Sequence, residues 1–212
     1  MIGFKIMLYF IRATFYKMWP GKERRMVELC EMCKLLNNKL KLEILVRVFE
    51  SKEGINVGYL ADDMQNSGLG LSGVSQYLKQ LERLGVVRRI RAGRYVNYEM
   101  DMRRADPKVR TAVEAIVSAV RKGESAMLLP AFGALMNPFR AGVVAAVAKA
   151  GAIPSEEICA KTEHQMKYLK RDLQAAVDAG LLDPDDSDTE HAIYHFVEPD
   201  DATVRLLVSL LS

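Results

Sequence analysis

The sequence has little of what marks a secreted, a metal-binding or a catalytic protein. Its 212 residues include only three cysteines and three histidines. Three cysteines are an odd number without a regular framework, which argues against a disulfide-stapled secreted protein. There is no glycine-rich phosphate loop, no nucleophile motif and no convincing metal cluster. We therefore expect neither an enzyme nor a bound cofactor.

Long hydrophobic runs are missing near the N-terminus. Within the apolar first twenty residues, the longest uncharged run is Ile6 to Ile11, far below the ~20 residues that cross a bilayer. No signal-peptide cleavage site follows. Residues 1–21 are predicted as an N-terminal extension: an amphipathic membrane-surface helix, a helix that packs on a partner, or an artefact of start-site choice, since Met26 opens a plausible domain. A packing helix and a start-site artefact are favoured over a membrane-surface helix. We therefore expect a cytoplasmic protein without a membrane partner.

The net charge of +3 is too small to indicate a partner, but the charge is unevenly distributed. Residues 1–121 carry 22 lysines and arginines against 13 aspartates and glutamates, whereas residues 122–212 carry 8 against 14. A basic half joined to an acidic half suggests that one face of the protein meets a polyanion and the other does not.

Residues 22–122 are predicted to form one domain. Apolar residues recur at helical spacing over residues 22–37, 40–51 and 57–65. A fourth helix is predicted to begin at Ser72, whose hydroxyl is suited to cap the first turn, and to end at Gly85.

The hydrophobic period changes after this fourth helix. Runs at residues 86–91 and 95–100 are rich in strand-forming side chains and flank Ala92-Gly93-Arg94, which predicts a hairpin. A helix from about Pro107 to Arg121 follows, with proline in its first turn. Four helices, a hairpin and a further helix are the order of a winged helix-turn-helix domain.

Residues 123–212 repeat this arrangement weakly. The apolar stripe that begins at Met166 matches the one that begins at Leu71 at a constant offset of 95, and Arg140 matches Lys41 at an offset of 99. A period of this size indicates domain duplication rather than a solenoid. The predicted fold is therefore α+β and mostly helical, with tandem winged helix-turn-helix modules of which the second is degenerate.

The fourth helix has the side chains that a recognition helix needs. A helix in the major groove presents small or polar side chains near its N-terminus, so that its backbone approaches the base edges, and glutamine pairs bidentately with adenine. Basic side chains later in the helix and in the hairpin would contact phosphates and supply salt-dependent affinity. The predicted DNA-binding residues are Ser72, Gly73, Ser75, Gln76, Tyr77, Lys79, Arg83, Arg88, Arg89, Arg91 and Arg94.

The segments Lys41–Leu45, Val57–Ala61, Leu71–Leu81, Gly85–Val87 and Ala92–Tyr98 together resemble successive blocks of the ArsR family of transcriptional regulators. The resemblance covers about residues 26–121, and its most specific part is the Val-Ser-Gln-Tyr-Leu core. Members of this family are dimeric bacterial repressors that release DNA when a metal or another effector binds. The resemblance implies that Ser75, Gln76 and Tyr77 face bases, and that the Arg91–Arg94 tip reaches the adjacent minor groove or backbone.

The sequence departs from the family pattern in two respects. Metal-sensing members carry Cys-x-Cys in the third helix, whereas Val57-Gly58-Tyr59-Leu60 contains no thiol or imidazole. An arsenic- or cadmium-type site is therefore not expected. Members are also usually single-domain proteins, whereas this chain carries a second copy of the module.

Cys30 and Cys33 are weak candidates for a metal or redox site. A closed zinc site would need two further ligands, and none lies nearby in the sequence. On a helix both thiols fall on the apolar stripe, where free cysteine packs as a small hydrophobe. Core packing is the favoured interpretation; redox sensing or a metal site shared by a dimer remains open. His164, His191 and His195 are interpreted as ordinary surface or cap residues.

The second module lacks the pattern of the first. Its recognition position offers Lys167, Lys170 and Arg171, but Asp172 replaces Tyr77. Phosphates would repel its acidic hairpin. We expect that it does not bind DNA as the first module does, and that it serves dimerisation, packs on the first module as a pseudo-dimer partner, or binds a protein or ligand. The acidic hairpin residues are Asp183, Asp185, Asp186, Asp188 and Glu190.

Together these features predict a sequence-specific transcriptional regulator that binds duplex DNA, acting as a homodimer or as a pseudo-dimer between its two modules. The main alternative is a protein-interaction module in which winged helices serve as assembly surfaces. An RNA-binding winged helix is a third interpretation.

Overall fold

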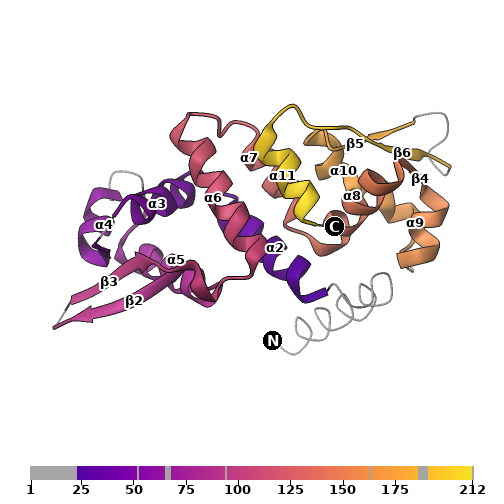
Figure 1. Cartoon of the computed structure of the whole chain (residues 1–212). Helices are drawn as coiled ribbons and strands as arrows, with labels where there is room; N and C mark the ends of the chain where they lie inside the picture. The colour runs from indigo at the N-terminus through magenta and orange to yellow at the C-terminus, as the bar shows by residue number, and fades with distance from the viewer. Residues whose placement is uncertain are drawn as a thin grey trace.

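The computed structural model of the chain describes residues 23–51, 53–64, 68–93, 95–162, 164–185 and 191–211. Over these ranges the fold is α+β and mostly helical, with two small three-stranded antiparallel sheets (Figure 1). The prediction of an α+β, mostly helical fold is thereby confirmed. The N-terminal extension predicted at residues 1–21 lies outside the described ranges.

The first half of the chain contains the predicted helices and hairpin, with ends that differ from the prediction by a few residues. A strand of two residues, β1, was not predicted, because it is too short to show an alternating pattern. The elements are α2 (Glu23–Leu36), α3 (Lys39–Glu50), β1 (Ile55–Asn56), α4 (Val57–Met64), α5 (Leu71–Arg83), β2 (Val87–Ala92), β3 (Tyr95–Met100), the 3₁₀ helix η2 (Met102–Arg104) and α6 (Pro107–Arg121).

The second half follows the same order of elements, again with a short strand that was not predicted. The acidic residues Asp186, Asp188 and Glu190 of its expected hairpin lie outside the described ranges. The elements are α7 (Leu128–Leu135), α8 (Pro138–Ala150), β4 (Ala152–Pro154), α9 (Ser155–Thr162), α10 (Met166–Asp178), β5 (Leu182–Pro184), β6 (Ile193–Phe196) and α11 (Ala202–Leu210). No single helix among the described residues is long and apolar enough to cross a membrane; α7 and α8 meet that test only as a pair, bent by 105°.

Helix caps recur at the periods that the sequence predicts. Asn38 caps α3 and Asn137 caps α8, each by accepting hydrogen bonds from the second and third N–H groups that follow it. Asp106 caps α6 by accepting from the N–H of Lys108, and Asp201 caps α11 by accepting from the N–H groups of Thr203 and Val204. Such caps satisfy N–H groups that have no partner within the helix. The two halves therefore share their local structure even where their sequences differ.

The two sheets have the same topology. Their strand orders are β1-β3-β2 and β4-β6-β5. Buried Tyr98 of β3 pairs with Ile55, and buried Tyr194 of β6 pairs with Ile153. In each sheet the central strand thus presents a tyrosine inward against the short first strand.

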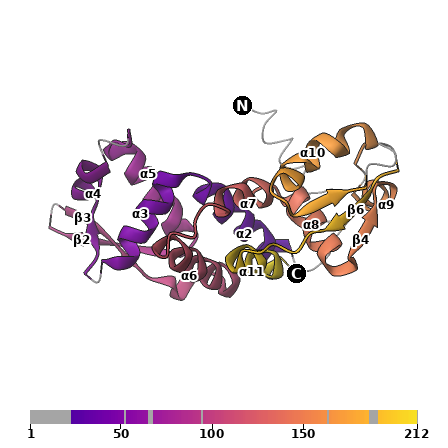
Figure 2. The ribbon, with the colours of Figure 1, turned by 90° about the horizontal axis from the view of Figure 1, so that it is seen from above.

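The two halves pack together through equivalent helices. Helix α2 contacts α7, and α6 contacts α11. Asn37 Nδ2 lies 3.7 Å from Met136 Sδ, and Lys108 Nζ donates to the carbonyl oxygen of Leu210 at 2.7 Å. The buried apolar residues of both halves form one continuous core. Figure 2 shows the two sheets at opposite ends of the molecule, with α2 and α7 between them.

The predicted cap of α5 is wrong. This helix begins at Leu71, one residue before Ser72, and its N-cap is Gly70 in an extended conformation without a side-chain hydrogen bond. Ser72 lies within the first turn and is exposed. Its hydroxyl is therefore displayed on the helix surface instead of being used to close the helix end.

Gly85 and Gly180 end α5 and α10, and they provide a matched test of local packing. Both have a positive φ, +72° and +66°. A Cβ atom at Gly85 would lie 2.7 Å from the carbonyl carbon of Arg104 in η2, whereas one at Gly180 would meet nothing within 4 Å. We expect Gly180→Ala to lower the free energy of unfolding by about 1 kcal/mol, the cost of a left-handed alanine.

Gly85→Ala should cost about 2 kcal/mol or more, because overpacking against backbone is added to that left-handed conformation. Urea denaturation of the full chain measures both losses. Equal losses would contradict the close packing of η2 on the end of α5.

Candidate nucleic-acid interface

Helix α5 presents a polar face to solvent because its apolar stripe is buried. Val74, Leu78 and Leu81 are fully buried in the core. Most side chains of the opposite face are exposed, and Ser75 is half-buried. Among the residues of this helix that were predicted to bind DNA, those with exposed side chains or backbone are Ser72, Gly73, Gln76, Lys79 and Arg83.

The prediction that Tyr77 faces DNA bases is wrong. Its side chain is 2% exposed, and its hydroxyl donates to the backbone carbonyl oxygen of Lys41 at 2.8 Å. Burial raises the pKa of Tyr77 well above its ordinary value. Position 77 follows Val74 by three residues and precedes Leu81 by four, so it falls on the inward face of the helix. Tyr77 therefore fastens α5 to α3 instead of meeting DNA.

A basic groove lies beside the C-terminal part of α5. It has a volume of about 360 Å³ and is formed where α2, α3 and α5 meet. Arg83 was predicted as a phosphate contact, whereas its neighbours were not, because they come from separate helices and only the tertiary structure brings them together. The polar side chains of this basic groove are Lys34, Lys41, Gln80 and Arg83, together with the single carboxylate of Glu31.

The β2–β3 hairpin carries exposed arginines whose charges are not equally available. Arg88 Nε donates to Glu99 at 2.9 Å and lies 3.6 Å from the Asp101 carboxylate. Arg103 also binds that carboxylate and, mainly through its hydrogen bond, holds the pKa of Asp101 well below its usual range. The charge of Arg88 is therefore largely offset.

Two other arginines of the hairpin, Arg89 and Arg91, are exposed. No salt bridge within the described part of the chain engages either of them. Their guanidinium groups are available to an external anion. Arg94, also predicted as a DNA contact, lies outside the described residues.

Cys30 and Cys33 lie in the core, as the core-packing interpretation expects. They are 2% and 0% exposed. Burial raises the pKa of Cys30 to about 12, and it raises the pKa of Cys33 well above the ordinary value. Across the described ranges, no group of three or more histidine, cysteine or acidic side chains is placed to hold a metal ion.

The three histidines have different surroundings. His191 pairs with Glu156 at the surface, and His195 is exposed. His164, interpreted from the sequence as a surface or cap residue, is instead packed between two partners. Its ring stacks on Phe139 with centroids 4.5 Å apart, and its Nε2 lies 3.1 Å from the Asp172 carboxylate.

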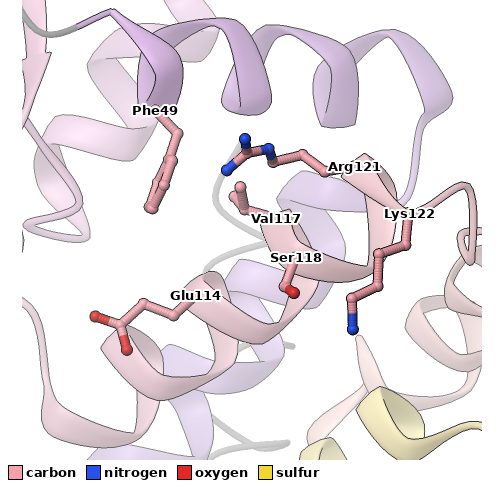
Figure 3. A pocket seen from close by; sticks show the side chains of 6 residues that line it. All are labelled: Phe49, Glu114, Val117, Ser118, Arg121 and Lys122. Atoms are coloured by element: carbon pink, nitrogen blue, oxygen red, sulfur yellow. The ribbon is translucent and has the colours of Figure 1, made fainter.

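A second hollow, of about 420 Å³, lies between α3 and α6 (Figure 3). Phe49 points into it from α3, opposite Glu114 and Val117 of α6. Arg121 at its rim lies 3.3 Å from Glu50, which balances its charge. This hollow is lined by two cations and one carboxylate, so it is less positive than the basic groove, which is lined by three cations and one carboxylate.

Comparisons with protein-family models, with curated proteins and with solved structures give no match. The properties of the interface therefore rest on the residues and their geometry.

The burial of the two core thiols predicts low reactivity. A disulfide reagent at pH 8 should modify at most Cys159 in the native protein, because buried, protonated thiols neither ionise nor meet the reagent. All three thiols should react in urea. Cys159→Ala should abolish the native-state reaction, and fast labelling of Cys30 or Cys33 in that variant would contradict their role as core residues.

Proposed function

We propose that the protein is a DNA-binding transcriptional regulator built from two winged helix-turn-helix modules, of which the first recognises sequence. The observation that carries this proposal is that three features occur together in the first half of the chain. They are the polar face of α5, the basic groove and the arginines of the β2–β3 hairpin. The order of α3, α4, α5, β2 and β3 supports the winged-helix assignment.

Base recognition is assigned to the N-terminal part of α5. Gly73 and Ser75 are small, which allows the helix backbone to approach base edges in the major groove. Gln76 is exposed on the same face, and its amide has the donor and acceptor that pair with adenine. The buried stripe and the hydrogen bond from Tyr77 hold the helix in one orientation, so these side chains are positioned before DNA binds.

Phosphate contacts are assigned to two basic regions that flank this face. On one side the basic groove supplies Lys34, Lys41 and Arg83. The hairpin supplies Arg89 and Arg91, whereas Arg88 is held by acidic neighbours. Such contacts fix the position of the protein on the duplex and make its affinity dependent on salt.

The experiment that tests the function is selection of random-sequence duplex DNA by the intact protein at two salt concentrations. Enrichment of a defined motif, lost when Ser75 and Gln76 are replaced by alanine, supports a sequence-specific regulator. Absence of enrichment, with only weak binding that vanishes at physiological salt, contradicts it and favours a protein-interaction module. Stronger binding to RNA of the same sequence would favour the RNA-binding alternative.

The two classes of contact predict different effects of mutation. Gln76→Ala should reduce discrimination against the wrong base at one position by roughly 1–3 kcal/mol, with a smaller effect on non-specific binding. Replacement of Arg89 and Arg91 by alanine should weaken all duplexes alike and reduce the slope of log K against log salt by about two units. Binding titrations with matched and mismatched duplexes measure both effects.

Tyr77→Phe is the control for these variants. It removes the hydroxyl that fastens α5 to α3 and leaves every outward side chain of the helix in place, so it should lower stability by about 1 kcal/mol and reduce base discrimination less than Gln76→Ala does. Indistinguishable behaviour of the Gln76 and arginine variants would refute the separate roles assigned to the helix and the hairpin.

A further inference from the structure

We propose that the exposed face of α10 is a second contact surface for duplex DNA, so that a single chain binds an asymmetric site with two helices. This inference rests on the proposed function of the first module. We call this surface the α10 cationic face and define it by Lys167, Tyr168, Lys170 and Arg171, all of which are exposed.

The α10 cationic face occupies the positions used by the recognition surface of the first half. Helices α5 and α10 are both 13 residues long, and they begin at Leu71 and Met166, which preserves the offset of 95. Leu169, Leu173 and Ala176 are buried. The four residues of the α10 cationic face therefore stand where Ser72, Gly73, Ser75 and Gln76 stand on α5.

The α10 cationic face is positively charged, although the half of the chain that contains it is acidic. Residues 122–212 carry 8 lysines and arginines against 14 acidic residues, yet three of those cations fall within residues 167–171. Clustering of cations in an acidic half, on the exposed side of one helix, provides local attraction for an anion.

Tyr168 organises two of these cations. Lys167 Nζ lies 4.7 Å and Arg171 Cζ 4.9 Å from the centre of its ring, within the range of cation–π attraction. Tyr168 is 39% exposed as a residue, and the side chain of Arg171 is 71% exposed. The neighbouring carboxylate of Asp172 is shared between Arg171 and His164.

The packing of the two halves directs both helices toward the same side. Because α2 packs on α7 and α6 on α11, equivalent surfaces of the halves are arranged about their common interface. In Figure 2, α5 and α10 lie toward one edge of the molecule and α6 and α11 toward the other. Figure 1 shows that these two helices belong to opposite halves of the molecule. A DNA-binding dimer uses two helices, one from each subunit, to reach successive turns of the duplex; here one chain contains two such equivalent helices.

The contact made by α10 differs from that made by α5. Lysine and arginine replace the small residues that let a backbone approach bases, which favours phosphate over base contacts. Asp183 and Asp185 are exposed at β5 and would repel phosphates, so the hairpin of the second half contributes no clamp. The expected footprint combines a sequence-specific section under α5 with a sequence-independent section under α10.

The test compares two variants of the full chain on DNA that carries the motif selected by the intact protein. The first replaces Lys167, Lys170 and Arg171 by glutamine. The control makes the same charge change at Lys122, Lys149 and Arg205, which are exposed and belong to the same half outside α10. Each is titrated on a duplex of about 30 base pairs and on one cut back to the motif itself.

On the long duplex the α10 variant should bind about tenfold more weakly than the control, with a salt slope lower by two to three units. Its selected motif should be unchanged, and the two variants should bind the short duplex equally. Sedimentation should give one chain per long duplex.

Equal affinity of the two variants on the long duplex, or two chains per duplex, overturns this inference while leaving the function of α5 intact. Failure of the intact chain to select any motif, in contrast, overturns the proposed function and this inference with it. Circular dichroism and urea denaturation of both variants check that exposed substitutions leave the fold unchanged.

Discussion

The packing of α2 on α7 and of α6 on α11 is the constraint on which the rest of the arrangement depends. Residues of these helices such as Leu29, Val113 and Phe132 are fully buried, and burial of apolar surface stabilises a protein by roughly 25 cal/mol per Å². The two halves therefore share one core. Because that core joins equivalent helices, it also determines where α5 and α10 lie relative to one another.

The two halves use one scaffold for different surfaces. Asparagine and aspartate caps, the strand order and the inward tyrosines recur in both. The outward residues do not, since small and amide side chains on α5 are replaced by cations and Tyr168 on α10. A fold positions such residues without specifying their chemistry, so the same helix serves base recognition in one half and phosphate attraction in the other under the functions proposed.

The interface was predictable only where it depends on helical spacing. Exposure of Ser72, Gln76 and Lys79 follows from the apolar stripe on the same helix. The inward position of Tyr77 was missed, because the family resemblance outweighed its place beside that stripe. The neutralisation of Arg88 by Glu99 and Asp101 depends on strand register and on the turn that follows β3, neither of which is visible in a run of basic residues.

The sequence by itself determined the α+β class, the helices and the first hairpin, and the offset at which the second half repeats the order of elements, because side-chain spacing acts over a few residues. Only the tertiary structure decided that the halves associate through equivalent helices and that Lys34 and Lys41 line a groove with Arg83. The contacts between the halves join residues about a hundred positions apart, such as Lys108 and Leu210. Local periodicity does not encode such pairings, since they arise from the shapes of surfaces that exist only after the elements have formed.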